Sequence, residues 1–497
     1  MSSRARRAFV MASLEQYLAL LLNFAMVAAV SRILTPAEIG IAVIGMGIGV
    51  IVFSLREFVT AEFLIQLPHV SGRDVRTAMT VLTAATLLLA ALLVAASPLL
   101  ARYYGEPGME VFLWLIAAAT LVETLSLPAL ALMRRDMAFG TITRIRTAGM
   151  ALTVVTTILL ALLGFGFMSY AWGALAGSVL DTGLSWLARR DARDLRPTFA
   201  SWRAVYEFGR FRGATGFIDR AYDALPSLVL GRLLTPSAVG IYNRANAVCA
   251  IPDRTLLGAV FSFAFPALAA EVREGRPVGE HYLRAISYIT ACYWPALILL
   301  AVLATPVVAF VLGPDWGEVV PLVRILSIAS LFFFPVILTR PVLMALGHNR
   351  DAFVAHFICR AVAAVVLCAA SPFGLLVMVS GQLIAIPIEM AVSLWFVRKH
   401  VGFAWHDLGR ILMGSAAVTA GAAAGLTGAL ALFGFRFDLS MTEAMFAAFA
   451  AAGGWLLAVV FMRHPVKDEL RPIIEQARRA CRRSINIPAA STTSEPG

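Results

Sequence analysis

The chain has 497 residues, of which 60% are hydrophobic and 14% charged, and its formal net charge is +11. An ordinary soluble domain has about 25% charged residues, so this composition excludes a soluble protein. The five cysteines have no metal-ligand spacing and the basic residues alternate with apolar segments, so the sequence predicts no metal site, no cofactor and no nucleic acid partner.

Apolar segments of about twenty residues, long enough to cross a bilayer core of about 30 Å, recur along the chain. They are predicted at 10–31, 39–66, 77–101, 109–132, 145–166, 169–188, 213–231, 239–266, 284–311, 319–344, 352–370, 374–397, 410–433 and 441–462. The fold class is therefore all-α integral membrane, with about fourteen transmembrane helices. The first segment resembles a signal peptide, but it is longer than the usual signal core and has a counterpart in the second half, so we expect it to be retained.

The distribution of basic residues predicts the orientation. If the N-terminus is cytoplasmic, nearly all Lys and Arg outside the spans lie on the cytoplasmic side, and the opposite loops hold Arg32, Arg102, Arg232 and Arg436. This asymmetry favours an even number of spans with both termini cytoplasmic. The outside loops are short and leave no room for an external catalytic domain. The basic tail either lies on the anionic inner leaflet or is solvated.

A duplicated segment joins the first two spans of each half. Residues 32–41, RILTPAEIGI, recur as residues 232–241, RLLTPSAVGI, with six of ten positions identical. Proline disfavours a helical residue before it, so each copy is predicted to be a turn, with Thr35 or Thr235 capping the next helix. Six spans separate the copies, which predicts two six-helix lobes related by a pseudo-twofold axis along the membrane normal.

This repeat divides the chain into four predicted parts. They are an N-lobe at 1–200, a C-lobe at 201–400, two C-terminal helices at 401–465 and a basic cytoplasmic tail at 466–497.

At the duplicated turns the chain resembles the polysaccharide transporter family, the Wzx-type flippases of the multidrug/oligosaccharidyl-lipid/polysaccharide exporter superfamily. The second-half match extends over 230–232, 240–245, 251–252 and 265–266, with Ile241 where many relatives have an aromatic residue. The chain looks most like the exopolysaccharide and colanic-acid branch. The resemblance implies a monomeric flippase, not an enzyme, in the bacterial inner membrane.

The same resemblance implies the cargo and the partners. The cargo would be a polyprenyl-diphosphate-linked oligosaccharide, moved by alternating access for exopolysaccharide or O-antigen-type synthesis. Membrane lipids surround such a protein, and a polysaccharide polymerase and chain-length or export proteins are its expected partners.

Arginines inside the predicted spans are the natural ligands of a diphosphate, because the planar guanidinium donates in parallel and stays ionised. Seven are present: Arg56, Arg220, Arg244, Arg254, Arg324, Arg340 and Arg360. In this superfamily the first two spans of each half line the cavity, so the resemblance favours Arg56, Arg220, Arg244 and Arg254. Arg244 lies in the family match, and Arg244→Ala is predicted to reduce export without reducing protein level.

Acids inside the spans are the candidates for ion coupling. Asp219 and Asp223 are four residues apart on one helical face, and Glu57 and Glu62 form a competing pair. A purely structural alternative pairs Arg220 with Asp223. The glycines at 45, 47 and 49 lie within an apolar span, where they indicate close helix packing or a hinge.

Three other functions compete with this interpretation. A peptidoglycan lipid-precursor flippase shares the fourteen helices and the fold. A drug or cation antiporter of the same superfamily usually stops at twelve helices and uses acids. A membrane glycosyltransferase or ligase normally has a sizeable external loop, which this sequence lacks.

Overall fold

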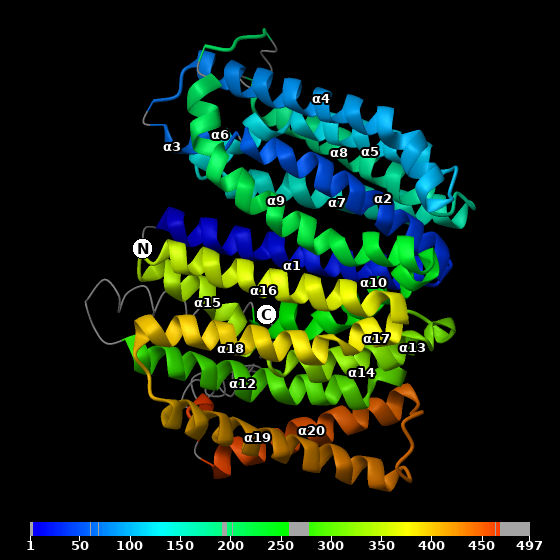
Figure 1. Ribbon diagram of the computed structural model, residues 1–497, viewed down its shortest axis with the longest axis vertical. Coiled ribbons are helices and arrows are strands. Elements are labelled where there is room, and N and C mark those ends of the chain that lie inside the picture. Colours follow the sequence, from blue (N-terminus) through cyan, green and yellow to red (C-terminus); the bar gives the residue numbers. More distant parts are fainter. Residues whose placement is uncertain are drawn as a thin grey trace, which may run out of the picture. The chain divides into compact units, whose positions relative to one another are not determined.

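The computed structural model describes residues 3–59, 61–67, 69–190, 196–200, 202–257, 278–462 and 464–467. Every regular element among these residues is helical (Figure 1). The predicted tail at 466–497 lies almost entirely outside the described residues.

The elements of the first half are α1 (Ser3–Ser31), α2 (Pro36–Ser54), the 3-10 turn η1 (Leu55–Phe58), α3 (Phe63–Gln66), α4 (Gly72–Tyr104), α5 (Met109–Thr124), α6 (Leu127–Arg135), α7 (Phe139–Leu162), α8 (Met168–Ala188), α9 (Trp202–Leu233), α10 (Pro236–Pro252) and the π-helical turn η3 (Asp253–Leu257). Those of the second half are α12 (Val278–Val302), α13 (Ala304–Val311), η4 (Pro314–Trp316), α14 (Val319–Ser330), α15 (Phe334–Ala345), α16 (Asn349–Ala370), η5 (Ser371–Phe373), α17 (Leu375–Ser380), α18 (Gln382–Val401), α19 (Trp405–Leu432) and α20 (Met441–Phe461).

In each of the fourteen predicted spans, the described residues include a helix. Among the described residues, ten helical segments are long and apolar enough to cross a bilayer, or eleven if α14 and α15, bent by 49°, form one span. The other three ranges hold α8, the charged helix α9, and α10, which has 17 described residues. The chain is thus an all-helical, multi-span membrane protein, and the number fourteen stays a prediction.

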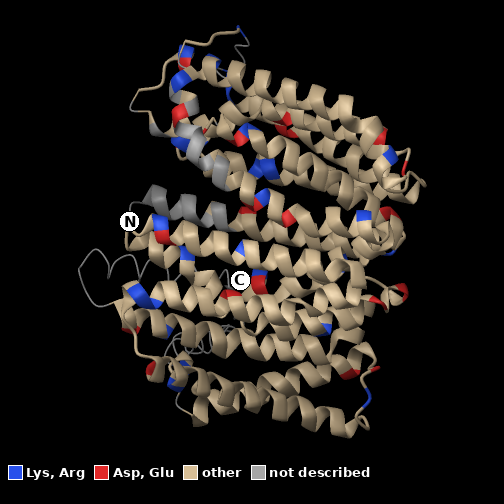
Figure 2. Ribbon diagram, viewed as in Figure 1, with Lys and Arg blue, Asp and Glu red and all other residues tan. Residues whose placement is uncertain are grey.

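Charged residues are sparse along the helices, and many of them lie near helix ends and loops (Figure 2). Large apolar side chains face outward instead, among them Leu88, Leu99, Phe449 and Phe461. Exposure of such residues would be costly in water, but it suits contact with lipid.

Two predicted spans are interrupted where the sequence suggested continuous helix. The span at 39–66 breaks after Ser54 into η1 and α3, and the span at 109–132 breaks between α5 and α6. Pro128, in the first turn of α6, accounts for the second break because proline has no amide hydrogen to donate to the carbonyl of Thr124. Interrupted helices are found at the binding sites of secondary transporters.

The described chain forms two compact units. One comprises 1–250, 307–326 and 360–385, and the other 251–306, 327–359 and 386–497. In the first unit α2 packs on α5 through glycines: a Cβ at Gly45 would lie 2.6 Å from the Phe112 ring, and one at Gly49 would lie 2.7 Å from Ile116. Gly45 and Gly49 therefore pack closely, whereas a Cβ at Gly47 would make only ordinary contacts. The predicted lobes, at 1–200 and 201–400, stay a prediction.

In the second unit, α12 is hydrogen-bonded to the last two helices. The Trp455 indole donates to the Ala291 carbonyl at 2.7 Å, and the Thr290 hydroxyl donates to Ser415 at 2.8 Å. The first bond is half-buried and the second is buried, and together they link α19 and α20 to α12.

The duplicated turns fold as predicted. The Thr35 hydroxyl accepts from the Glu38 amide at 3.3 Å, and the Thr235 hydroxyl accepts from the Ala238 amide at 3.2 Å. The two copies also touch each other within the first unit. A Cβ at Gly40 would lie 1.7 Å from the Pro236 carbonyl oxygen, and one at Gly240 would lie 2.0 Å from that of Pro36. The first turns of α2 and α10 therefore meet in a reciprocal backbone contact that only glycine permits.

Candidate substrate site

A charged pocket of about 390 Å³ lies within the first unit, where α2 ends and α9 passes. Its lining residues are Arg56, Glu57, Val59, Glu62, Leu82, Leu127, Gly216, Asp219 and Arg220. The pocket thus contains two of the four predicted cations and three of the four predicted acids. Residues far apart in sequence meet here because both interrupted spans and the middle of α9 converge.

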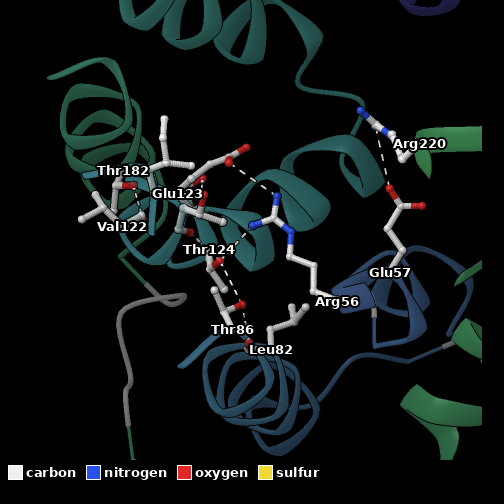
Figure 3. A network of polar contacts seen from close by, with 12 residues as sticks. Arg56, Glu57, Leu82, Thr86, Val122, Glu123, Thr124, Thr182 and Arg220 are labelled. Atoms are coloured by element: carbon white, nitrogen blue, oxygen red, sulfur yellow. Dashed lines mark hydrogen bonds and ion pairs between the residues drawn. The ribbon is translucent and has the colours of Figure 1, made fainter. Parts of the chain in front are cut away.

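Arg56, on η1, is held by the end of α5 (Figure 3). Its Nη1 donates to the Thr124 hydroxyl at 3.0 Å, and its Nη2 lies 3.4 Å from the Glu123 carboxylate. Thr124 is fully buried, donates to the Thr120 carbonyl at 2.7 Å and lies 3.2 Å from the Thr86 hydroxyl. The hydroxyls therefore fix the guanidinium at the pocket wall.

Arg220, on α9, is paired with Glu57 on η1 at 3.7 Å (Figure 3). A Cβ at Gly216 would lie 2.0 Å from the Glu57 carboxylate, so glycine lets this side chain pack against α9. Although α9 occupies a predicted span, the Arg220 side chain is 55% exposed. A charged group at membrane depth must face water or protein, so this exposure indicates a hydrated space.

The remaining acids of the pocket make the wall more acidic than the sequence suggested. Glu62 pairs with Arg134 of α6 at 3.4 Å, and Asp219 lies on α9 beside Arg220. Three carboxylates and two guanidinium groups line the pocket. The acids of the pocket therefore outnumber its two arginines, which the sequence singled out as diphosphate ligands.

Asp223, the fourth predicted acid, does not line the pocket. It lies 3.8 Å from the Arg360 guanidinium of α16, which also stacks at 4.2 Å over the Tyr222 ring. The structural alternative for α9 paired Arg220 with Asp223. Among the described residues each of the two forms an ion pair with a different partner. Arg220 pairs with η1, and Asp223 pairs with α16.

Arg244 is buried at 3% exposure and donates to the Tyr170 hydroxyl of α8 at 2.8 Å. Its Nε makes no hydrogen bond within the part of the chain that the structure describes. This placement favours a packing role for Arg244 in the conformation seen here, and its contact with substrate stays a prediction.

Arg254 is exposed on η3, in the second unit. Its neighbour Asp253 accepts a hydrogen bond from the Tyr293 hydroxyl of α12. Both repeat helices, α2 and α10, therefore end in a short non-α turn, and each turn carries an arginine next to an acid. The similarity between the two halves thus extends, at the level of structure, beyond the residues that match in sequence.

A larger cavity, of about 1100 Å³, lies in the first unit beside α1 and α7. Apolar and hydroxyl side chains supply most of its wall, and its one arginine, Arg144, donates to the Gly140 carbonyl at 3.1 Å. The predicted site residues are absent from its wall, so the smaller charged pocket is the better candidate. Among the described residues no group of three or more His, Cys, Asp or Glu could hold a metal ion.

The hydroxyl groups that accept hydrogen bonds from Arg56 and Arg244, or support those that do, were not predicted from the sequence. Thr86, Thr124 and Tyr170 are ordinary residues of apolar spans, and their partners come from helices remote in sequence. The acids were visible as charges inside spans, but their pairing was not, because pairing depends on how the helices pack.

The fold of the chain is shared by two solved membrane proteins. A solved structure of the lipid II flippase MurJ, in an inward closed conformation, matches with a TM-score of 0.72 over 92% of this chain and 98% of that chain, at 13% identity. An inward-facing multidrug resistance MATE family transporter of the MOP superfamily matches with a TM-score of 0.61 over 80% of this chain and 98% of that chain, at 14% identity. The predicted all-helical membrane fold class is therefore confirmed, and the fold is like those of MurJ and MATE.

The family follows from the sequence comparison. A model for the family described as "Polysaccharide biosynthesis protein" matches residues 29–321, more than half of the chain. The chain belongs to this family. The family that the duplicated turns suggested is thereby confirmed.

Curated relatives agree with this assignment. Lipopolysaccharide biosynthesis protein WzxC of Escherichia coli (strain K12) is 23% identical over 62% of this chain and 63% of its own length. Succinoglycan biosynthesis transport protein ExoT of Rhizobium meliloti (strain 1021) is 24% identical over 67% of each chain. Teichuronic acid biosynthesis protein TuaB of Bacillus subtilis (strain 168) is 21% identical over 52% of this chain and 54% of its own. The match spans less than two thirds of WzxC and TuaB.

Proposed function

We propose that this chain flips polyprenyl-diphosphate-linked oligosaccharide repeat units across the bacterial inner membrane by alternating access. The flipped units would supply exopolysaccharide or O-antigen-type synthesis, with a polymerase and chain-length or export proteins as downstream partners. The observation that carries the proposal is the pocket that Arg56 of η1 and Arg220 of α9 line together. Two arginines in one hydrated pocket suit the two phosphates of such a lipid.

The predicted orientation supports this use of the pocket. With a cytoplasmic N-terminus, α1 leads outward and α2 returns, so Arg56, just after α2, lies toward the cytoplasmic side. A lipid-linked oligosaccharide assembled in the cytoplasm would enter there. The glycan cannot cross hydrocarbon unaided, because each hydroxyl would lose its water partners at a cost of several kcal/mol.

The acids of the pocket supply the candidates for ion coupling in this proposal. Glu57, Glu62 and Asp219 line the same space as the arginines. An acid in such a position binds a cation more readily when the anionic cargo is near, which links the two movements. Asp223, which does not line the pocket, would contribute to ion coupling through its ion pair with Arg360.

A cation or drug antiporter is the second candidate, because three acids line the pocket against two arginines. The two proposals differ in what the arginines do. A diphosphate carrier requires them for cargo, whereas a cation carrier needs them only to balance the acids.

The deciding experiment is a complementation assay in a strain that lacks the gene. Surface or secreted polysaccharide and the lipid-linked oligosaccharide on each leaflet are measured for Arg56→Ala with Arg220→Ala, and for the control Arg102→Ala in the last turn of α4. We expect the double variant to accumulate lipid-linked oligosaccharide on the inner leaflet, and the control to export normally. Normal export by the double variant at normal protein level would refute the proposal.

A further inference from the structure

Both arginines of the pocket have a carboxylate partner on another element. Arg56 on η1 faces Glu123 on α5 at 3.4 Å, and Arg220 on α9 faces Glu57 on η1 at 3.7 Å. Charge-assisted hydrogen bonds from arginine to carboxylate are normally about 2.7–2.9 Å long. These two contacts are therefore ion pairs without tight hydrogen bonding.

The two partners of Arg56 differ in how firmly they are held. Thr124 is fully buried, and its own hydroxyl is committed to the Thr120 carbonyl, so it accepts from Arg56 in a fixed position. The Glu123 side chain is 34% exposed and meets Arg56 only at 3.4 Å. Thr124 thus holds the guanidinium of Arg56 in place, and Glu123 is the partner that another anion can replace.

Glu57 is likewise a partly exposed carboxylate partner of Arg220 that can exchange. Its side chain is 31% exposed, that of Arg220 is 55% exposed, and both line the pocket. An ion pair so accessible to water contributes about 0.2–1 kcal/mol, because solvent screens it. A better anion can therefore replace the carboxylate at little cost.

We infer that Glu57 and Glu123 are internal competitors of the cargo, whose phosphate oxygens replace these carboxylates at Arg220 and Arg56 while Thr124 keeps Arg56 in place. The inference rests on the proposed function and deepens it by assigning a role to Glu123 and Glu57. Each phosphate offers several oxygens to the guanidinium fork, more than a carboxylate can.

The competition makes the pocket selective among anions. A single carboxylate on a sugar offers Arg56 or Arg220 nothing that Glu123 or Glu57 does not already supply. A diphosphate carries more charge and binds both arginines at once, so it displaces both carboxylates. The two glutamates thereby reject weakly charged anions and admit a diphosphate.

Binding of farnesyl diphosphate to the purified full-length protein in detergent, measured by calorimetry, tests the inference. Glu57→Gln and Glu123→Gln keep the shape of each side chain but remove its charge. Each should bind the probe about twofold to fivefold more tightly than the parent, because the competing pair contributes up to about 1 kcal/mol. Glu110→Gln, at the opposite end of α5 from Glu123, is the matched control and should bind as the parent does.

The outcomes separate this inference from the proposed function. Binding that depends on Arg56 and Arg220 but is no tighter in either Gln variant overturns the inference and leaves the site intact. Binding that is absent, or unchanged in Arg56→Ala with Arg220→Ala, overturns the site and the inference together. If a Gln variant does not fold, Glu123→Asp retains the charge but withdraws the carboxylate by one methylene group. Tighter binding than in the parent is then expected, and unchanged or weaker binding contradicts the inference.

Discussion

The contact between the two repeats predicts an unusual response to glycine substitution. In a helix, replacing glycine by alanine normally stabilises by about 1 kcal/mol, because the unfolded chain loses freedom. At Gly40 the new Cβ would lie 1.7 Å from the Pro236 carbonyl oxygen, so the two turns must part by about 1.3 Å to restore a distance near 3.0 Å. The obstacle is backbone, which cannot rotate away. Overpacking of this kind costs about 1–3 kcal/mol, so Gly40→Ala should be destabilising.

The assay is the apparent Tm of the protein in detergent, with Gly47→Ala as the matched control. Gly47 lies on the same helix, but a Cβ there would lie 3.6 Å from the Ala224 Cβ, an ordinary contact. We expect the Tm to fall for Gly40→Ala and to hold or rise for Gly47→Ala. Gly240→Ala should resemble Gly40→Ala and add little to it, since the first substitution has already parted the turns. Equal Tm values for Gly40→Ala and Gly47→Ala, or fully additive losses, would refute the reciprocal contact.

Two further predictions follow from buried polar contacts. Tyr170→Phe should lower the Tm by removing the hydroxyl that accepts from Arg244, a loss of about 1–3 kcal/mol for a buried charged donor, with export per folded molecule unchanged; lost export at an unchanged Tm would instead favour Arg244 as a substrate ligand. Burial lowers the pKa of His464, which follows α20, accepts from the Val466 amide and lies 3.1 Å from the Ser287 hydroxyl. Below the ordinary histidine pKa of about 6.5 the unfolded chain therefore binds more protons than the folded one, so stability is full above that pH and falls as the pH drops. Melting curves of the parent and His464→Gln should diverge at neutral pH and converge in acid, and parallel pH profiles would contradict this.

Local sequence signals predicted the elements that depend on neighbours in the chain. Thr35 and Thr235 cap the helices that follow them, because a cap needs only an oxygen near the first amides. Gly45 and Gly49 of α2 do pack closely, as small residues in an apolar span indicated. Apolar length located the helices, and the duplicated turn identified the family.

The interruptions of the spans were less visible. A sequence window that averages hydropathy does not register the break between α5 and α6, although Pro128 signals it in retrospect. The break after Ser54 has no comparable marker, and the structure offers no simple physical account of it. Both breaks matter, because they bring Arg56 and Glu123 together.

The amino-acid sequence by itself determined that this chain is a duplicated, helical membrane protein and which charges lie inside its spans. It did so because hydrophobic length, charge asymmetry and turn chemistry are local properties. Only the tertiary structure decided which of those charges share a pocket, that Arg244 is buried against Tyr170, and that Glu57 and Glu123 oppose the arginines. Such pairings depend on the packing of helices far apart in the chain, where a few ångströms decide whether an arginine meets water, a hydroxyl or a carboxylate.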